Sequence, residues 1–300
     1  MNMERLAGAF GARISGIDLA AADEGVTCAL YDLLLEHRFI VIPDQQLTFD
    51  VYAAVGHRWG RPVLLISEKN RVGSHPEIIR QSNAESTPIF VRNVASHWHC
   101  DSSYEAEVAA TTLLYGVQAP EHGGETLFCD LVAAYRALPD AKRRDLDELQ
   151  VWHGVSAATA LEGEVIVKPA DLPLEARKAV RSSDPVLHPL VQRHPANGRH
   201  ALYGLGGSPY SVAHMPEKDG ARLLLDLRRH ATQAEYCSRY KLMPGDVLIW
   251  DNYSVMHRAT PIDYSDQPGA RRENYRISVK GLPVGYTQSR GGSPRAALEG

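Results

Sequence analysis

Hydrophobic and polar residues follow one another along this chain with the periods of many short strands and a few amphipathic helices. Apolar residues at three- and four-residue spacing predict helices over Cys28–His37 and Glu217–Ala231, each with one leucine-rich face. Two further helices are predicted over Asp50–Trp59, with Asp50 as the N-cap, and over Leu131–Leu138, which Pro139 ends. The helices therefore lie near the start of the chain and between groups of strands.

Short runs of β-branched, aromatic and other apolar residues, bounded by turn residues, predict the strands. They are Phe39–Ile42, Thr111–Val117, Glu125–Cys129, Val247–Trp250 and a last strand from Arg272 to about Lys280. The turn His194–Gly198 predicts a hairpin between Pro189–Gln192 and His200–Gly204. Many short strands with helices at the start and in insertions favour a mainly β core with helical decoration.

No shift in amino-acid composition along the chain marks a domain boundary, so residues 1–300 are predicted to form one domain. The stretch 67–98 is rich in Ser, Asn, Pro and charged residues, which predicts loops and a lid over a site. Residues from about 285 to 300 are rich in Gly, Ser and Pro and are predicted to be a flexible tail.

The overall charge and the cysteines narrow the class of protein. The formal net charge of -4 gives no reason to expect a nucleic acid or an anionic membrane as partner. No apolar run approaches the length of a membrane span, and Met1–Gly11 lacks the features of a signal peptide. Four widely spaced cysteines without a C-x-x-C pair are typical of reduced thiols in a cytosol. We therefore predict a cytoplasmic protein.

The motif His99-Cys100-Asp101, together with His257 far downstream, is the strongest candidate for chemistry. In an extended strand, residues i and i+2 project from the same face, so His99 and Asp101 can hold one ion together. A histidine from a distant strand would complete a 2-His-1-carboxylate triad, which binds non-haem Fe(II) and leaves metal positions open. His97 is a rival ligand on the same face, whereas His75-Pro76-Glu77 has the same pattern but is predicted to be loop.

Several segments, taken in order, resemble the taurine dioxygenase family. They are His97–Tyr104, Gly123–Phe128, Ala133–Pro139, Gly245–Asn252, His257–Thr260 and Arg271-Arg272. The resemblance extends over roughly residues 8 to 283 and includes Gly11-Ala12 and Gly16–Leu19 near the start. Within the family, Phe128–Asp130, His188–Val191 and His230–Gln233 are most similar to the chlorophenoxyacetate dioxygenase branch.

The resemblance implies a double-stranded β-helix (jelly-roll) fold, Fe(II) as metal, 2-oxoglutarate as co-substrate and O2 as oxidant. It makes His99, Asp101 and His257 the iron ligands and matches Thr126 and Arg272 to the residues that hold the far carboxylate of 2-oxoglutarate. Arg276 matches the arginine that binds an anionic substrate, although a structural ion pair is an alternative role.

The physical chemistry of these residues agrees with that assignment. An arginine offers a planar fork that pairs with a carboxylate through two hydrogen bonds, and a threonine hydroxyl can donate one more. Arg272 and Arg276 are four residues apart, so they share one face of a strand, and Arg271 faces the other way. The segment Tyr264–Gly269 is an insertion relative to the family, which leaves the choice between Arg271 and Arg272 open.

The predicted function is therefore that of a 2-oxoglutarate-dependent dioxygenase, an oxidoreductase that hydroxylates a small, anionic organic acid and forms succinate and CO2. If the substrate is an aryloxyalkanoate, hydroxylation next to the ether oxygen releases a phenol and glyoxylate. A natural-product or amino-acid hydroxylase of the same family is the alternative, because one scaffold hosts many pockets. A homo-oligomer is left open.

Two alternatives come from other classes of protein. A zinc hydrolase could use the same three ligands, with tetrahedral geometry and an activated water. It would give no reason for Thr126 and Arg272 to be present. A non-catalytic jelly-roll binding protein is the other alternative, and it gives no reason for the complete ligand set.

Overall fold

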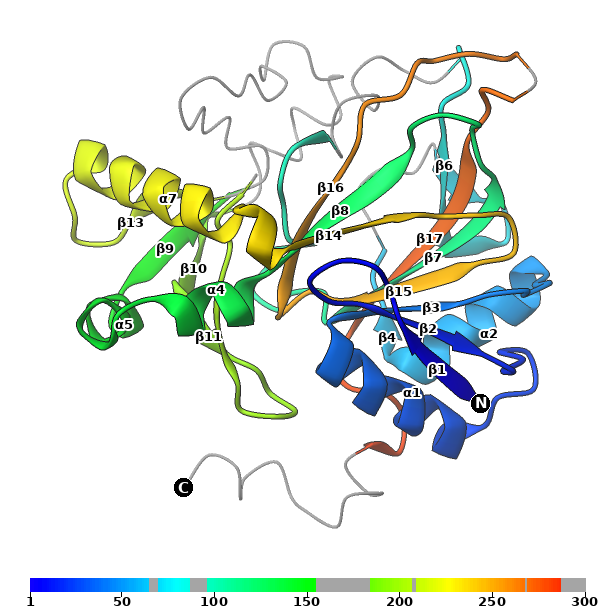
Figure 1. The fold of residues 1–300 in the computed structure, drawn as a ribbon, viewed down its shortest axis with the longest axis horizontal. Coiled ribbons are helices and arrows are strands. Elements are labelled where there is room, and N and C mark those ends of the chain that lie inside the picture. The colour runs from blue at the N-terminus through cyan, green and yellow to red at the C-terminus, as the bar shows by residue number, and fades with distance from the viewer. Residues whose placement is uncertain (65–69, 87–95, 155–183, 207–208, 268, 287–300) are drawn as a thin grey trace.

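The structure, a computed structural model, describes residues 1–64, 70–86, 96–154, 184–206, 209–267 and 269–286. In these ranges two mainly antiparallel β-sheets pack face to face, and helices cover their outer surfaces (Figure 1). Most of the predicted tail, and parts of the predicted 67–98 loop region, lie outside the described residues.

The larger sheet contains nine strands in the order β1-β2-β3-β15-β7-β17-β6-β5, with β4 also paired to β17. Their bounds are β1 Asn2–Arg5, β2 Ala12–Ser15, β3 Phe39–Ile42, β4 Arg61–Pro62, β5 Arg71–Val72, β6 His75–Ser82, β7 Thr111–Gln118, β15 Val247–Asp251 and β17 Glu273–Lys280. The central strands β15, β7 and β17 are consecutive neighbours in the sheet, although they lie far apart in the sequence. This interleaving of distant strands is what the predicted jelly roll requires.

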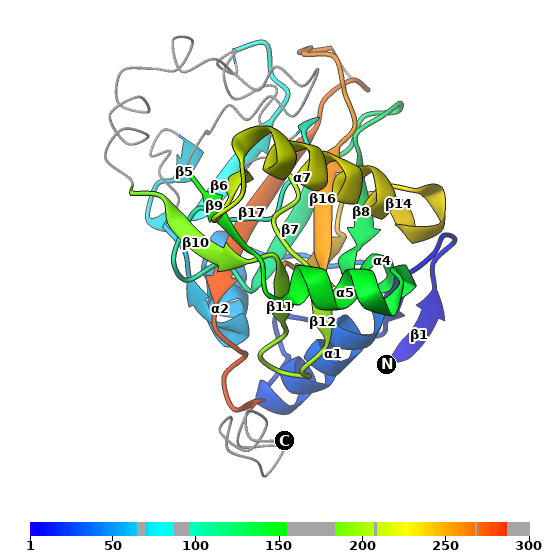
Figure 2. The same ribbon diagram turned by 90° about the vertical axis from the view of Figure 1, so that its left-hand side faces the viewer.

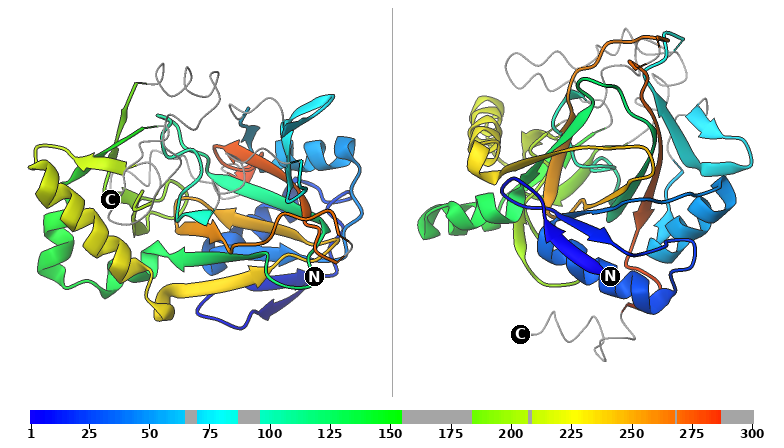
Figure 3. Two further views of the ribbon diagram at one scale, coloured as in Figure 1. Left: turned by 90° about the horizontal axis from the view of Figure 1, so that it is seen from above. Right: turned by 45° about the vertical axis from the view of Figure 1, so that its right-hand side comes forward.

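The smaller sheet consists of three strands in the order β14-β8-β16 and closes the other side of the sandwich. Its strands are β14 Cys237–Lys241, β8 Glu125–Asp130 and β16 Val255–Ala259. Phe128 of β8 packs against Leu114, Phe39 and Trp250 of the larger sheet in the core between the two sheets. Figure 3 shows the two sheets from above and from one side, with the smaller sheet facing β7 and β17.

Helices cover the outer face of each sheet. The described helices are α1 Glu24–His37, α2 Phe49–Trp59, α4 Leu131–Ala137, α5 Asp140–Asp147, α7 Glu217–Ala231 and the short 3-10 helix η4 Ala234–Tyr236. Helices α1 and α2 pack on the larger sheet through residues such as Leu30, Leu34 and Trp59. Helices α4 and α7 pack beside the smaller sheet through Ala134, Leu224 and Leu227 (Figure 2).

Two small sheets extend the molecule beside the sandwich. Strands β9 Gln150–His153, β10 Val186–Pro189 and β13 Pro209–Val212 form one, in the order β10-β9-β13. The other is the predicted hairpin, in which β11 Val191–Arg193 pairs with β12 His200–Leu202.

Two details differ from the sequence prediction. The segment His75–Ser82, predicted to be loop, is strand β6, because its backbone pairs with β17 and buries Ile78 and Ile79 despite the proline and charges around them. Helix α2 begins after Thr48, whose side chain accepts the Val51 N–H, so Thr48 and not Asp50 is the N-cap. All four cysteines are free thiols, as predicted.

None of the described helices is long and apolar enough to span a lipid bilayer.

Candidate metal and co-substrate site

The two histidines of the predicted site lie directly opposite each other in the backbone. The N–H of each donates to the carbonyl oxygen of the other at 2.9 Å, which forms an isolated antiparallel bridge between the segment before β7 and strand β16. Because opposed residues of such a pair project to the same side, the imidazole rings of His99 and His257 lie 4.2 Å apart, centre to centre. The fold therefore brings together two side chains that are far apart in the sequence.

Gly206 explains how the segment that carries His99 can lie so close to its neighbours. A Cβ atom on Gly206 would lie 2.0 Å from the carbonyl oxygen of Trp98, so only glycine allows this approach. Trp98 is buried in the cluster beside the smaller sheet. The contact fixes the backbone one residue before the histidine.

Asp101 completes the group, but from a turn and not from a regular strand. The Nε2 atoms of His99 and His257 each lie 3.7 Å from Asp101 Oδ1, and one ligand atom from each of the three residues lies within 4.8 Å of the others. Among the described residues, these three form the group that could hold a metal ion, and the rival ligand His97 is not part of it. We call these residues the His99–Asp101–His257 trio.

The protonation states of the trio suit a divalent cation. Burial lowers the pKa of His99 and holds the pKa of His257 well below its ordinary value, so both rings are neutral near pH 7. Burial by itself would raise the pKa of Asp101, but Arg276 and the two histidines outweigh it and lower that pKa to about 2. Two neutral imidazoles and one carboxylate are the donor set that Fe(II) takes in non-haem sites.

The tautomer of one ring is fixed by the backbone. His99 Nδ1–H donates to the carbonyl oxygen of His97 at 2.7 Å, so its Nε2 lone pair faces Asp101. His257 Nδ1 is buried without a hydrogen-bond partner among the described residues. The ring of Trp250 packs against His257 at 4.8 Å between centroids and restricts its rotation.

A buried hydrogen-bond network holds the carboxylate of Asp101. Thr112 Oγ1 donates to Asp101 Oδ2 at 2.7 Å and accepts a hydrogen bond from Asn252 Nδ2 at 2.9 Å. The hydroxyl of Ser278 lies 3.1 Å from that of Thr112. The sequence pattern indicated no role for Thr112 or Ser278, because these residues come together only in the folded chain. The one signal was Asn252, which belongs to the Trp250–Asn252 motif.

Arg276 lies at the trio. Its Nη2 atom is 2.8 Å from Asp101 Oδ1, and its Nε donates to Ser278 Oγ at 3.1 Å. The register pairs Arg276 with Leu114, a residue of the core between the sheets, so the guanidinium projects into that interior. The predicted substrate arginine therefore contacts the carboxylate of the trio.

The two candidate arginines for the co-substrate differ in their surroundings. Arg271 forms ion pairs with Asp266 and Glu273, so its charge is already compensated. Arg272 is joined to no carboxylate by an ion pair within the part of the chain that the structure describes. Its Nε atom is buried without a partner, and burial lowers its pKa. Of the two, Arg272 is the cation that no carboxylate of the described residues pairs and whose Nε–H has no acceptor there.

Thr126 enters the sandwich from the same end as Arg272. It lies two residues from Phe128 on β8, hence on the face of that strand where Phe128 lies 6.0 Å from the His257 ring. The loops that precede Thr126 and Arg272 are tied together by a hydrogen bond from Glu121 N–H to the carbonyl oxygen of Gly269. Thr126 therefore lies on the same strand face as Phe128, and the loop before it contacts the loop before Arg272.

Asn83, for which the sequence pattern indicated no role, fixes the loop before Arg272. This fully buried residue donates from Nδ2 to the carbonyl oxygens of Asp263 and Ala270, at 2.9 and 2.7 Å. Its Oδ1 accepts the backbone N–H of Arg272 at 2.7 Å, and its carbonyl oxygen accepts the N–H of Ser265. One side chain thus anchors the inserted loop and the start of β17.

We expect Asn83→Ala to lower the free energy of unfolding by about 2–4 kcal/mol, because the fully buried Asn83 side chain is lost and three backbone groups lose a part-buried hydrogen bond at once. Urea denaturation measures this change. Asn197→Ala is the matched control, since the exposed Asn197 side chain accepts only the nearby Arg199 N–H and should cost less than about 1 kcal/mol. Equal stability losses in the two variants would contradict the anchoring role.

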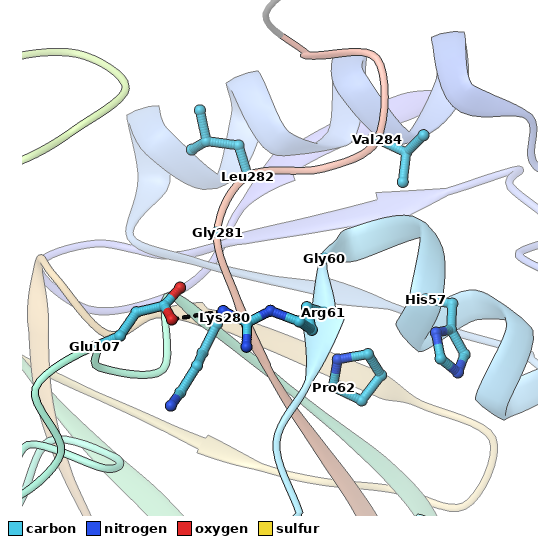
Figure 4. Close-up of a pocket in the computed structure, with 9 residues that line it drawn as sticks. All are labelled: His57, Gly60, Arg61, Pro62, Glu107, Lys280, Gly281, Leu282 and Val284. Atoms are coloured by element: carbon cyan, nitrogen blue, oxygen red, sulfur yellow. Dashed lines mark hydrogen bonds and ion pairs between the residues drawn. The ribbon is translucent and has the colours of Figure 1, made fainter.

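A surface groove of about 480 Å³ lies elsewhere, beyond the end of β17 (Figure 4). Its lining includes His57, Arg61, Glu107 and Lys280 but no residue of the trio. Arg61 is paired with Glu107, and Lys280 with Glu105, each at 2.5 Å. The groove therefore offers no free cation for an anionic ligand and is not the candidate site.

Comparisons with known proteins agree with the fold and the site. The family model "Taurine catabolism dioxygenase TauD, TfdA family" matches residues 2–278. The chain therefore belongs to this family, and it is an oxidoreductase of the 2-oxoglutarate-dependent dioxygenase class.

Two curated relatives are named for a chlorophenoxyacetate and a phenoxypropionate. The alpha-ketoglutarate-dependent 2,4-dichlorophenoxyacetate dioxygenase of Cupriavidus pinatubonensis is 37% identical over 61% of this chain, and the alignment covers 59% of that relative. The (S)-phenoxypropionate/alpha-ketoglutarate-dioxygenase of Sphingobium herbicidovorans is 28% identical over 93% of this chain and 94% of the relative.

Solved structures show the same architecture. A taurine dioxygenase from Burkholderia xenovorans superposes with a TM-score of 0.73 at 26% identity, over 93% of this chain and 90% of the other. AAD-2 in complex with Mn(II) and N-oxalylglycine superposes with a TM-score of 0.73 at 26% identity, over 94% of this chain and 99% of the other. The predicted jelly roll is confirmed.

Proposed function

We propose that the protein holds Fe(II) with His99, Asp101 and His257, binds 2-oxoglutarate with Thr126 and Arg272, and hydroxylates a small organic acid. The observation that carries the proposal is the convergence of the trio, with its ligand atoms within 4.8 Å of one another. Bound iron would supply activation of O2 coupled to the oxidative decarboxylation of 2-oxoglutarate to succinate and CO2.

The chain's own residues provide binding, orientation and exclusion of water. Thr112 holds the Asp101 carboxylate in one orientation, and the His97 carbonyl holds the His99 ring. Arg272 supplies the charge for the far carboxylate of the co-substrate, and Thr126 supplies one hydroxyl donor. Phe128 and Trp250 form an apolar wall beside His257 that keeps bulk water away from the reacting atoms.

The same observations argue against the two alternatives from other classes. A zinc hydrolase gives no reason for Thr126 and for Arg272, whose buried Nε has no partner among the described residues, and a binding protein needs no preorganised set of metal ligands. Oxygen consumption that depends on both iron and 2-oxoglutarate would separate the proposal from both.

For the primary substrate we propose an anionic aryloxyalkanoate. The support is the naming of the two curated relatives and the position of Arg276 beside the trio, where it pairs with Asp101 in the structure and would face the substrate. A natural-product or amino-acid substrate is the alternative. A homo-oligomeric state stays a prediction that light scattering can test.

The experiment is a substrate panel scored by succinate release and by mass detection of the oxidised product. We expect phenoxyacetate and 2-phenoxypropionate to give succinate and phenol in equal amounts, while taurine and free amino acids give no product. Succinate without phenol would refute the aryloxyalkanoate assignment alone. The absence of succinate with every compound, in iron-loaded protein, would contradict the proposed activity.

A further inference from the structure

Cys129 and Cys237 face each other across two strands of the smaller sheet. Strand β14 pairs with β8 in a register that sets Cys237 directly opposite Cys129, and the two Sγ atoms are 2.9 Å apart. Both residues are free thiols in the structure. Opposed residues of an antiparallel pair have their Cα atoms about 4.5–5.5 Å apart, which lies within the range that a disulfide spans. A bond between the two sulfurs can therefore form without a shift of either strand.

The pair lies on the face of the smaller sheet that is turned away from the trio. Phe128, the neighbour of Cys129 on β8, packs in the core between the two sheets, so Cys129 projects to the opposite face. There Cys129 belongs to the hydrophobic cluster that includes residues of helices α4 and α7, and Cys237 packs against this cluster. A bond on this face does not involve the side of β8 on which Phe128 packs against His257.

The two cysteines also mark the points where one long segment leaves the smaller sheet and returns to it. The chain runs from β8 through α4, α5, the two small sheets and α7 before it comes back as β14, and 108 positions separate the two cysteines. Figure 1 shows these helices and small sheets beside the sandwich. A bond between Cys129 and Cys237 closes this segment at its base, and closing so long a loop restricts the unfolded chain strongly.

The surroundings of the two thiols give them different reactivities. Cys237 is partly exposed, whereas Cys129 is fully buried. The hydrogen bond between the two thiols and the charge of Arg258 lower the pKa of Cys237, and burial raises the pKa of Cys129. A partly exposed thiol with a lowered pKa is the one that attacks a disulfide brought by solvent, and a second thiol beside it can then complete the exchange.

We propose that Cys129 and Cys237 are a modification site, at which exchange with a small-molecule disulfide such as glutathione disulfide forms a reversible bond between them. The Cys237 thiolate attacks one glutathione sulfur, which forms a mixed disulfide and releases one glutathione thiolate. Cys129 Sγ then attacks Cys237 Sγ and releases the second glutathione thiolate. The two protein thiols are oxidised to one disulfide, glutathione disulfide is reduced to two thiols, and each proton passes to a released thiolate.

Peptide mass spectrometry of the full chain, after incubation in glutathione buffers of increasing oxidised fraction, tests this site. The protein is kept folded and anaerobic, so that glutathione disulfide is the sole oxidant, and the remaining thiols are alkylated in denaturant before digestion. We expect one cross-linked peptide pair, which joins Cys129 to Cys237, while Cys28 and Cys100 are recovered in alkylated form. Excess dithiothreitol should reverse the link.

The melting temperature gives an independent readout. We expect oxidation to raise that of the parent protein by about 5 °C, because the long loop is closed. The same treatment should change that of Cys237→Ser by less than about 1 °C, since the bond cannot form; Cys237→Ala replaces this variant if it does not fold. Cys28→Ser is the matched control, because Cys28 lies on α1 in the cluster on the larger sheet. It should form the link and gain stability as the parent protein does.

Four results would overturn the proposal. One is the absence of the link in folded protein at every oxidised fraction, with the link forming only after unfolding in urea. Another is a mixed disulfide with glutathione that persists at Cys237, because Cys129 would then not be within reach. A link from Cys129 to Cys100, which lies in the same cluster, would assign the wrong pair. A lower melting temperature in the oxidised parent protein would show that the native strands do not accept the bond.

Discussion

Replacing His257 with alanine is expected to abolish succinate formation and to weaken Fe(II) binding by more than about 100-fold, because removing a ligand costs more than the 10- to 100-fold loss typical of a residue behind a ligand. The variant keeps only His99 and Asp101, on one segment of chain, and loses the histidine that reaches them from β16. Competition with a chromogenic chelator measures the metal affinity, and coupled detection of succinate measures turnover.

The fold of this variant should survive. His257 Nδ1 has no hydrogen-bond partner among the described residues, so truncation leaves no buried donor or acceptor without its partner. His57→Ala is the matched control, because that imidazole is 62% exposed and lies outside the trio. Unchanged iron affinity in folded His257→Ala, or an equal loss in His57→Ala, would contradict the assignment.

Replacing Arg272 with methionine is expected to raise the KM for 2-oxoglutarate by about 100-fold, which corresponds to the loss of a largely desolvated charge pair. The melting temperature of the protein without co-substrate should stay equal or increase, because the Arg272 Nε is buried without a partner when no carboxylate is bound. Weaker binding of 2-oxoglutarate together with an unchanged or higher melting temperature is the result expected for a residue whose role is to bind the ligand.

Arg271→Met provides the comparison for this second prediction. Arg271 is adjacent in sequence and equally charged, but it pairs with Asp266 and Glu273. We expect it to change the KM for 2-oxoglutarate by less than about threefold, the range of an exposed ion pair. If Arg271→Met and not Arg272→Met raises the KM, the two residues have the reverse roles.

The strongest periodic patterns of the sequence predicted their elements well. Glu217–Ala231 is helix α7 with the predicted bounds, and the buried run Phe39–Ile42 is strand β3. Strand β6 was missed, because its apolar residues Ile78 and Ile79 are surrounded by a proline and charges. Its strand conformation comes from pairing with β17, a partner almost 200 residues away in the sequence that local patterns do not contain.

The chemistry of the site was more visible in the sequence than its geometry. His99, Asp101 and His257 were predicted from residue type and motif, and the structure brings their ligand atoms together. The expected strand through His99 and Asp101 was wrong, since His99 forms a single bridge and Asp101 lies in a turn. The role of Asn83 could not be predicted, because the function of an amide side chain depends on which groups the fold places around it.

Anomalous scattering at the iron edge, from crystals grown anaerobically with Fe(II), tests the central claim most directly. We expect one strong peak per chain, within bonding distance of the Nε2 atoms of His99 and His257 and of an Asp101 carboxylate oxygen. A peak at any other group of side chains, or fully incorporated iron with no peak at these three, would contradict the account.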